Sequence, residues 1–317
     1  TDTLTISNLG TTTLGATAVV GGAAAFSGVE TVVLTGASTL NVTPTAALAV
    51  TGGAGATVIA GTGQTITVTQ GAGQTLGLSG TSNYAVAGGT TGAITSTATG
   101  TLTVTSSANA QTVTASGATT VNAAALGAAL TLAGAGAKTV TGVGTVANAV
   151  VTEAATNDGA LTISTVDTTA STITLLTGAT GAFVLNAVGT GGAAVVTLTA
   201  LTASHSSHTI NMTTTSAVTI DNDSTATAYT VVATDANAHI FVGDDGTSAV
   251  VTYTGGSGVD TVTLAEGADN FTSGGGADVY NIVAATDTAI ALGFTASAAV
   301  PTAAIGTTGM DVITGMT

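Results

Sequence analysis

Four aspartates that recur every nine residues are the side chains of this sequence best suited to do chemistry: Asp260, Asp269, Asp278 and Asp287. Residues 255–263 read GGSGVDTVT and fill every fixed position of the calcium-binding nonapeptide G-G-x-G-x-D-x-U-x, where U is apolar. The next two nonapeptides, LAEGADNFT and SGGGADVYN, keep the aspartate, the glycine two positions before it and the apolar position. The fourth, IVAATDTAI, keeps only its aspartate. This register predicts a calcium site, and ordinary glycine–aspartate turns are the alternative.

The nine-residue spacing explains why these residues would bind a cation. Six residues form a turn and three form a short strand, so two nonapeptides make one coil of a parallel β-roll. Asp260 and Asp278 then stack on one edge of the roll, and Asp269 and Asp287 stack on the other. Stacked carboxylates repel one another, and Ca²⁺, which takes about six to eight oxygen ligands, removes that repulsion. We expect the aspartates and the tight turns beside them to form the site: Gly255, Ser257, Asp260, Gly267, Asp269, Gly274, Gly276, Asp278 and Asp287.

Short β-strands must position these residues, and the pattern of short β-strands extends over the whole chain. Apolar residues alternate with threonine in segments such as 65–69 (TITVT), 101–105 (TLTVT) and 171–175 (STITL). Segment centres fall near residues 58, 66, 76, 86, 94, 102, 112, 121, 130, 140 and 150, and the nearly even spacing becomes wider and less regular afterwards. No segment has a convincing helical period, and the alanine-rich residues 122–129 are the best helical candidate.

Evenly spaced strands are compatible with a chain of β-sandwich domains or with a β-solenoid, in which each strand stacks on its equivalent one coil later. A sandwich core is about 10 Å thick and is filled by large side chains. Five Phe, four Tyr and no Trp in 317 residues are too few for such cores, whereas Ala, Val and Thr suit a narrow solenoid. We therefore predict an all-β chain, an irregular β-solenoid that ends in a calcium-binding parallel β-roll.

The acidic residues divide this chain into segments. Five of the 16 lie in residues 1–220 and the other 11 lie in residues 221–317. We predict a Thr/Ala/Gly-rich solenoid scaffold over residues 1–238, a calcium-binding β-roll over 239–290, and a linker with the start of a further repeat-like segment over 291–317.

Composition excludes several classes of function. The chain carries one Lys, no Arg and a formal net charge of -15, so it lacks the basic groups that nucleic-acid binding requires. It has no Cys, which excludes disulfides, thiol catalysis and Cys-based zinc sites. Its longest apolar stretch, residues 122–137, is glycine-broken and shorter than the roughly 18–20 residues of a membrane helix. The chain opens at Thr1 without a readable targeting signal, which suggests a processed product or a fragment.

The nonapeptides resemble those of the RTX (repeats-in-toxin) family, and the chain as a whole is similar to RTX-type surface-layer proteins of Gram-negative bacteria. Residues 26–34 (FSGVETVVL) are similar to the F-x-G-[VI]-E-T-[VL] strands of such proteins, and the near absence of Lys and Arg fits them. The resemblance implies type I secretion and calcium-dependent assembly of identical copies into a coat on the bacterial cell surface. It also implies an anchor to lipopolysaccharide or another surface polysaccharide, through a region that this chain does not show.

From these observations we predict an extracellular, non-enzymatic structural protein that binds Ca²⁺ and assembles with copies of itself into a lattice, filament or sheath. An RTX adhesin or biofilm matrix protein is the alternative. Outward threonines also admit an ice-binding protein, although irregular strand spacing argues against a lattice match. A polysaccharide-cleaving enzyme would use paired carboxylates beside histidines, and we expect those histidines to lie in surface loops instead. The relevant residues are Asp221, Asp223, Asp244, Asp245, His205, His208 and His239.

Overall fold

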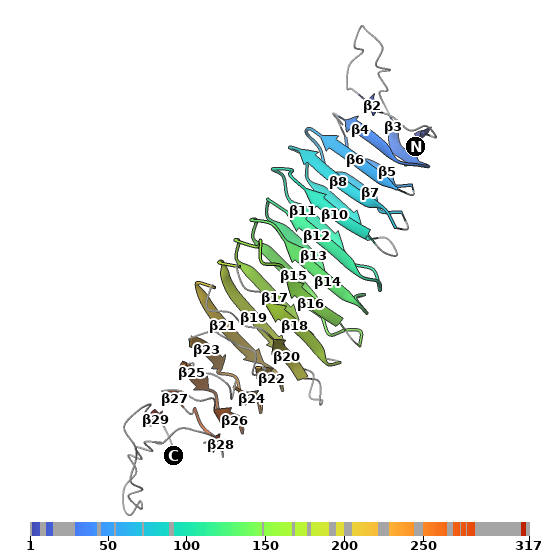
Figure 1. Ribbon diagram of the computed structural model, residues 1–317. Helices are drawn as coiled ribbons and strands as arrows, with labels where there is room; N and C mark the ends of the chain where they lie inside the picture. The colour runs from blue at the N-terminus through green and yellow to red at the C-terminus, as the bar shows by residue number, and fades with distance from the viewer. Residues whose placement is uncertain are drawn as a thin grey trace, which may run out of the picture. The chain divides into compact units, whose positions relative to one another are not determined.

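The computed structural model shows a parallel β-solenoid (Figure 1). It describes residues 2–6, 11–14, 29–42, 46–53, 55–71, 73–88, 92–147, 149–166, 169–175, 179–189, 195–199, 205–220, 228–243, 250–264, 269–272, 274–276, 278–282 and 312–314. These residues form 29 strands and no helix. The all-β solenoid predicted from the sequence is thus confirmed, and the alanine-rich residues 122–129 are turns and strand ends.

The chain forms two compact units, the first made of Thr1–Thr141 with Thr156–Gly159 and the second of Gly142–Ala155 with Ala160–Thr317. In the first unit the odd-numbered strands form one parallel sheet in chain order, and the even-numbered strands form another. Its strands are β1 (Asp2–Ile6), β2 (Thr11–Leu14), β3 (Val29–Leu34), β4 (Ser38–Val42), β5 (Leu48–Thr51), β6 (Ala56–Gly61), β7 (Ile66–Thr69), β8 (Thr75–Gly80), β9 (Tyr84–Ala87), β10 (Gly92–Ser96), β11 (Leu102–Thr105), β12 (Gln111–Ala115), β13 (Thr119–Asn122), β14 (Ala129–Ala133) and the first residues of β15 (Lys138–Val143).

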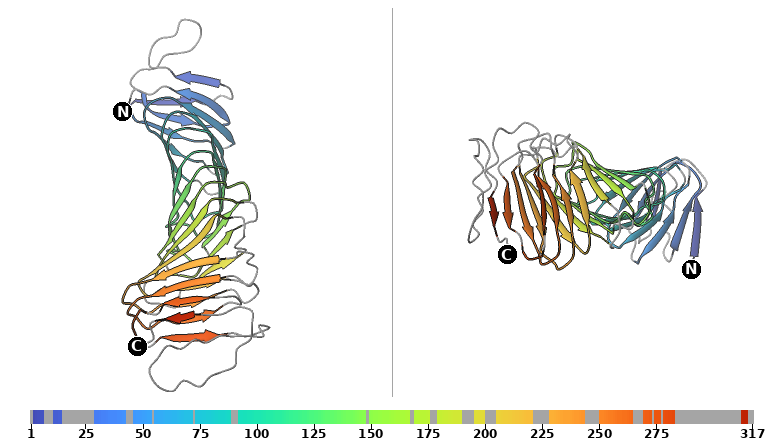
Figure 2. Two further views of the ribbon diagram at one scale, coloured as in Figure 1. Left: turned by 90° about the vertical axis from the view of Figure 1, so that its left-hand side faces the viewer. Right: turned by 90° about the horizontal axis from the view of Figure 1, so that it is seen from below.

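The second unit repeats this arrangement, with β17 to β29 in one sheet and β16 to β28 in the other. Figure 2 shows the strands of successive coils lying side by side within each unit. The strands are β16 (Ala149–Glu153), β17 (Leu161–Thr165), β18 (Ser171–Leu175), β19 (Ala182–Val188), β20 (Val195–Thr199), β21 (Ser207–Thr213), β22 (Ala217–Ile220), β23 (Ala228–Ala233), β24 (Ile240–Val242), β25 (Val250–Gly255), β26 (Thr261–Leu264), β27 (Asn270–Thr272), β28 (Val279–Ile282) and β29 (Val312–Thr314).

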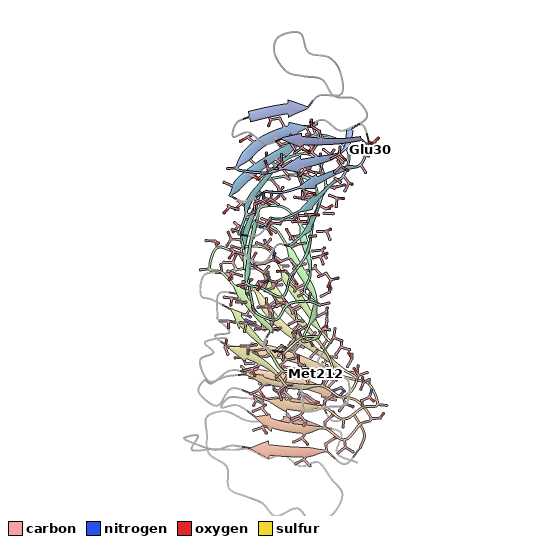
Figure 3. The ribbon with its side chains drawn as sticks, turned by 90° about the vertical axis from the view of Figure 1, so that its right-hand side faces the viewer. Glu30 and Met212 are labelled. Atoms are coloured by element: carbon pink, nitrogen blue, oxygen red, sulfur yellow. The ribbon has the colours of Figure 1, made fainter. Side chains whose placement is uncertain are left out.

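The core of each unit is the narrow interior between its two sheets, and alternation along the strands fills it. In β7, Ile66 and Val68 are fully buried while Thr67 and Thr69 are exposed. This follows from the period of two in a β-strand, which sends successive side chains to opposite faces. Full burial of a Val, Leu or Ile side chain stabilises by about 1.5–3 kcal/mol, so every coil adds to the stability. Of the two residues labelled in Figure 3, Met212 is buried and Glu30 is exposed.

In the first unit the first coil is long, with Thr3 paired to Thr31, and the coils from β3 onward have a nearly constant length, whereas in the second unit the length varies. Ile66 pairs with Tyr84 and Tyr84 pairs with Leu102, so these successive coils have the same length. In the second unit Leu161 pairs with Phe183 and Phe183 pairs with His208, so these two coils are longer and unequal. The strands themselves remain in parallel register, so the irregularity predicted from strand spacing resides in the loops. Loops tolerate insertions because they lie outside the ladder of backbone hydrogen bonds.

One buried cation lies in the first unit. Lys138, the only Lys in the chain, is 1% exposed. Its Nζ donates hydrogen bonds to the carbonyl oxygens of Ala115 (3.1 Å), Gly134 (2.9 Å) and Gly136, and it lies 3.3 Å from Asn157 Oδ1. A Cβ at Gly136 would lie 2.0 Å from Gly117 O, which explains the glycine in this closely stacked turn. The ammonium group therefore provides hydrogen-bond donors for backbone carbonyl oxygens that lie inside the stacked turns.

Candidate functional site

The structure places Asp260 and Asp278 at equivalent turn positions of adjacent coils. Thr261 pairs with Val279, so the residue before each strand occupies the same place, as the spacing of two nonapeptides predicts. Asp278 Oδ1 accepts a hydrogen bond from Asp260 N (2.9 Å), and Asp260 Oδ1 accepts one from His239 N (3.1 Å). Asp260 is 1% exposed. Two carboxylates thus lie on one edge of the second unit, and each also joins its turn to the preceding coil.

The glycines of the nonapeptides allow the backbones of successive turns to touch. A Cβ at Gly274 would lie 1.8 Å from Gly256 O, and one at Gly258 would lie 1.8 Å from Asn237 O. Gly275 N donates to Gly256 O at 2.6 Å, which shows how closely the turns stack. Gly276 also has a φ of 103°, a conformation that side chains other than glycine rarely adopt. These glycines therefore allow the turns of successive coils to stack with their backbones in contact, beside Asp260 and Asp278.

The predicted glycines and serine of this edge lie in the two stacked turns. Gly255 ends β25, and a Cβ there would lie 3.0 Å from Asp260 Oδ2, so the glycine leaves room beside the carboxylate. Ser257 is exposed at the turn, and its backbone N donates to Asp235 O at 3.1 Å. Gly274 and Gly276 belong to the next turn. The predicted residues of the Asp260/Asp278 edge are therefore neighbours.

Asp269 lies on the other edge, directly before β27. It is fully buried, and its Oδ1 accepts a hydrogen bond from Val251 N at 2.8 Å. The two other predicted members of this edge, Gly267 and Asp287, lie outside the described residues. The structure therefore describes one predicted carboxylate on this edge and two on the Asp260/Asp278 edge.

Burial and a neighbouring carboxylate both disfavour the ionised form of the Asp260 side chain. Burial raises the pKa of Asp260 above its ordinary value, and the nearby Asp278 carboxylate raises it further. Hydrogen bonds from the Tyr253 side chain and the His239 backbone, with the charge of His239, oppose this rise without cancelling it. A carboxylate in this position is stabilised by a cation placed beside it.

Oxygen donors of this kind fit Ca²⁺, a hard cation that binds carboxylate and backbone carbonyl oxygens. Among the residues that the structure describes, however, no three His, Asp or Glu side chains converge closely enough to hold a metal ion. A calcium ion beside Asp260 and Asp278 would therefore take further ligands from the carbonyl oxygens of the glycine turns. The carboxylates of the site fit the metal in chemical type.

Sequence reasoning missed that the preceding coil carries the same turn. Residues 234–239 (TDANAH) stack on residues 255–260 (GGSGVD), because Ile240 pairs with Thr261 and Ser257 N donates to Asp235 O at 3.1 Å. His239 thus occupies the position of Asp260. Ser216 occupies it one coil earlier still, because Ala217 pairs with Ile240. We name these four equivalent residues the turn column: Ser216, His239, Asp260 and Asp278.

Three residues around this turn form a hydrogen-bonded chain of the Ser–His–Asp type. His239 Nδ1 lies 3.0 Å from Ser216 Oγ, and His239 Nε2 lies 2.8 Å from Asp235 Oδ1. Such a chain can activate a serine nucleophile when the hydroxyl faces a substrate. Here Ser216 is 2% exposed and His239 is fully buried. The burial of both groups favours a role in holding the turns together.

The expectation that the histidines lie in surface loops is wrong. His205 and His208 are each 6% exposed, and their ring centroids lie 5.3 Å apart inside the second unit. His205 Nε2 lies 2.7 Å from Glu153 Oε2, and the His208 ring packs edge-on against Tyr229. His205 precedes β21 whereas His208 lies within it, so strand alternation does not separate them. The carboxylates suggested as their partners, Asp221, Asp223, Asp244 and Asp245, lie outside the described residues.

Comparison with known proteins adds no relative to these observations. The chain matches no protein-family model, no curated protein and no solved structure. Among the described residues, no helix is long and apolar enough to cross a membrane.

Proposed function

We propose that this chain is a secreted structural protein of the bacterial cell surface, which folds its carboxyl-terminal coils around Ca²⁺ and assembles with copies of itself into an extracellular lattice or coat. The observation that carries the proposal is the pair of stacked carboxylates, Asp260 and Asp278, in glycine turns whose backbones touch. Bound between such coils, Ca²⁺ supplies positive charge where the fold buries negative charge. The aspartates and the turn carbonyls act as its oxygen ligands.

Charge supports a role for cations in assembly. The second unit contains 13 of the 16 acidic residues, and the first contains Asp2, Glu30 and Asp158 together with the only Lys. Copies of such a chain repel one another through their second units at neutral pH. Calcium bound there reduces the repulsion and orders the acidic coils at the same time. Folding and association would then both follow calcium concentration, because a ligand that binds only the folded state stabilises it.

The same proposal accounts for secretion and partners. A chain whose carboxyl-terminal coils fold only with calcium stays loose where calcium is scarce and folds where it is abundant. The proposed partners are further copies of the chain, and lipopolysaccharide or another surface polysaccharide where the coat meets the cell. The repeats of the β-solenoid suit a coat, because each coil adds one strand to each of the two parallel sheets of its unit.

A calcium titration of the purified full chain tests this proposal. Circular dichroism and light scattering are recorded together as calcium is added and then removed with a chelator. We expect strand signal and particle size to rise with calcium and to fall with chelation. The double variant Asp260→Asn/Asp278→Asn should shift the midpoint to higher calcium by tenfold or more.

The matched control is Asp158→Asn, which removes an exposed carboxylate from the first unit. It should leave the midpoint within a factor of two of the unmodified chain. Equal shifts in the control and the double variant would contradict the assignment of the site to Asp260 and Asp278. Strand ordering without any growth in particle size would contradict the assembly part of the proposal.

A further inference from the structure

The turn column changes chemistry along the second unit. Its side chains run from a hydroxyl at Ser216 through an imidazole at His239 to the carboxylates of Asp260 and Asp278, one residue per coil. The backbone continues through the change, because Ile240 N donates to Ser216 O (2.9 Å) and Thr261 N donates to His239 O (2.8 Å). Four equivalent turns therefore stack in one way but offer different groups to a ligand.

In the turn that contains His239, the carboxylate of Asp235 has hydrogen-bond partners within the protein. Asp235 Oδ2 accepts a hydrogen bond from Thr214 N (2.7 Å). Asp235 Oδ1 accepts from Asn237 N (2.8 Å) and lies 2.8 Å from His239 Nε2. The other ring nitrogen of His239 lies 3.0 Å from Ser216 Oγ. Both oxygens of the carboxylate and both nitrogens of the ring thus have partners.

The pKa values of Asp235 and Asp260 are shifted in opposite directions. Burial tends to raise the pKa of Asp235, but the hydrogen bonds from Asn237, His239 and Thr214 outweigh it and lower this pKa to about 2. Burial raises the pKa of Asp260, and its neighbour along the turn column is a second carboxylate. Protein donors thus face both oxygens of Asp235, whereas the residue that follows Asp260 in the turn column is a second carboxylate, Asp278.

We infer that His239 sets the boundary of the calcium-binding part of the roll: its imidazole occupies the place that a metal-binding carboxylate fills in the next two coils, and it gives Asp235 an internal partner. The coil that ends in β24 therefore folds without metal, and calcium orders only the coils of β26 and β28. This inference rests on the proposed calcium binding and states where it begins. The coil that ends in β24 would then provide the metal-free chain with a folded edge on which the calcium-dependent coils of β26 and β28 can form.

Hydrogen–deuterium exchange of the full chain, with calcium or with a chelator, tests the inference. We expect the amides of β22 and β24 to exchange slowly in both conditions. The amides of β26 and β28 should exchange at least tenfold more slowly with calcium than without it. Equal dependence of β24 and β26 on calcium would overturn the inference and leave calcium binding intact. Calcium without effect on any strand would overturn the proposed function, and the inference with it.

The variant His239→Asp provides a second measurement. It adds a carboxylate to the turn column and removes the partner of Asp235, so β24 should become calcium-dependent and the chain should bind an additional equivalent of calcium in equilibrium dialysis. The control Ser216→Ala removes the other partner of the ring and should leave the calcium stoichiometry unchanged. A folded His239→Asp variant with the stoichiometry of the unmodified chain would contradict the inference. Exchange in the unmodified chain decides the question if this variant does not fold.

Discussion

Replacement of Lys138 by Met tests whether the interior of the first unit depends on its buried ammonium group. The ammonium has three N–H donors, and it lies within hydrogen-bonding distance of four oxygens, three of which are backbone carbonyls. Met keeps most of the apolar stem but donates no hydrogen bond. The Ala115 carbonyl keeps a hydrogen bond from Gly136 N at 3.3 Å, whereas the carbonyls of Gly134 and Gly136 lose their charged donor.

The cost of Lys138→Met follows from these two carbonyls. A buried carbonyl left without its donor costs about 1–3 kcal/mol, and the part-buried carbonyl of Gly134 costs less than the buried carbonyl of Gly136, so the pair costs about 2–4 kcal/mol in the free energy of unfolding. For a domain of about 150 residues, each kcal/mol lowers the melting temperature by about 2–4 °C. The expected decrease for Lys138→Met is therefore on the order of 10 °C.

Thermal unfolding followed by circular dichroism, in the presence of chelator, measures this decrease without a contribution from calcium. The control is Thr139→Val, an isosteric change at the exposed neighbour on the same strand, which should stay within about 0.5 kcal/mol of the unmodified chain. An amine-reactive ester adds a second reading: the native chain should react at its terminal amine, and Lys138 should react only after unfolding. A Lys138→Met variant as stable as the control, or rapid labelling of native Lys138, would refute the reasoning.

Three further changes probe other buried groups. Tyr84→Phe removes the hydroxyl that accepts from Gly61 N (2.8 Å), so urea unfolding should show a loss of about 1–2 kcal/mol; no loss would contradict the hydrogen bond. Glu153→Ala removes the buried carboxylate that lies 2.7 Å from His205 Nε2 and leaves the ring without this partner, so it should cost at least about 1–3 kcal/mol in the same assay, a cost that a neutral result would exclude. The pKa of Asp235 is lowered from 3.8 to about 2, so this group stabilises the fold above pH 3.8 and loses that effect as pH falls toward 2. Asp235→Asn should flatten the acid side of the stability profile, and an unchanged slope would contradict this assignment.

The strand pattern of this fold could be predicted from sequence because it depends on local alternation. The segment centres expected near residues 58, 94 and 140 fall within β6, β10 and β15. Parallel pairing followed from the scarcity of large aromatic side chains, which favours a narrow interior over a thick sandwich core. The nine-residue period also predicted the stacking of Asp260 on Asp278, because two nonapeptides make up the coil that separates them.

The polar groups inside the units could not be predicted in this way. His205 was expected in a surface loop, and the burial of Lys138 was not predicted, because the sequence does not show which carbonyl or carboxylate the neighbouring coil brings to them. His239 was missed for a related reason: its separation from Asp260 does not fit the nine-residue register, and only strand pairing reveals the equivalence. Loop length varies freely between coils, so equivalence across coils is a property of the ladder and not of sequence spacing.

Anomalous diffraction from crystals of the full chain grown in calcium tests the central claim most directly. Our account predicts an anomalous peak beside the carboxylates of Asp260 and Asp278, with backbone carbonyl oxygens of the glycine turns among the ligands, and no peak beside His239. Ordered turns around Asp260 and Asp278 with no peak between them would contradict it, because the fold would then hold these carboxylates together without the metal.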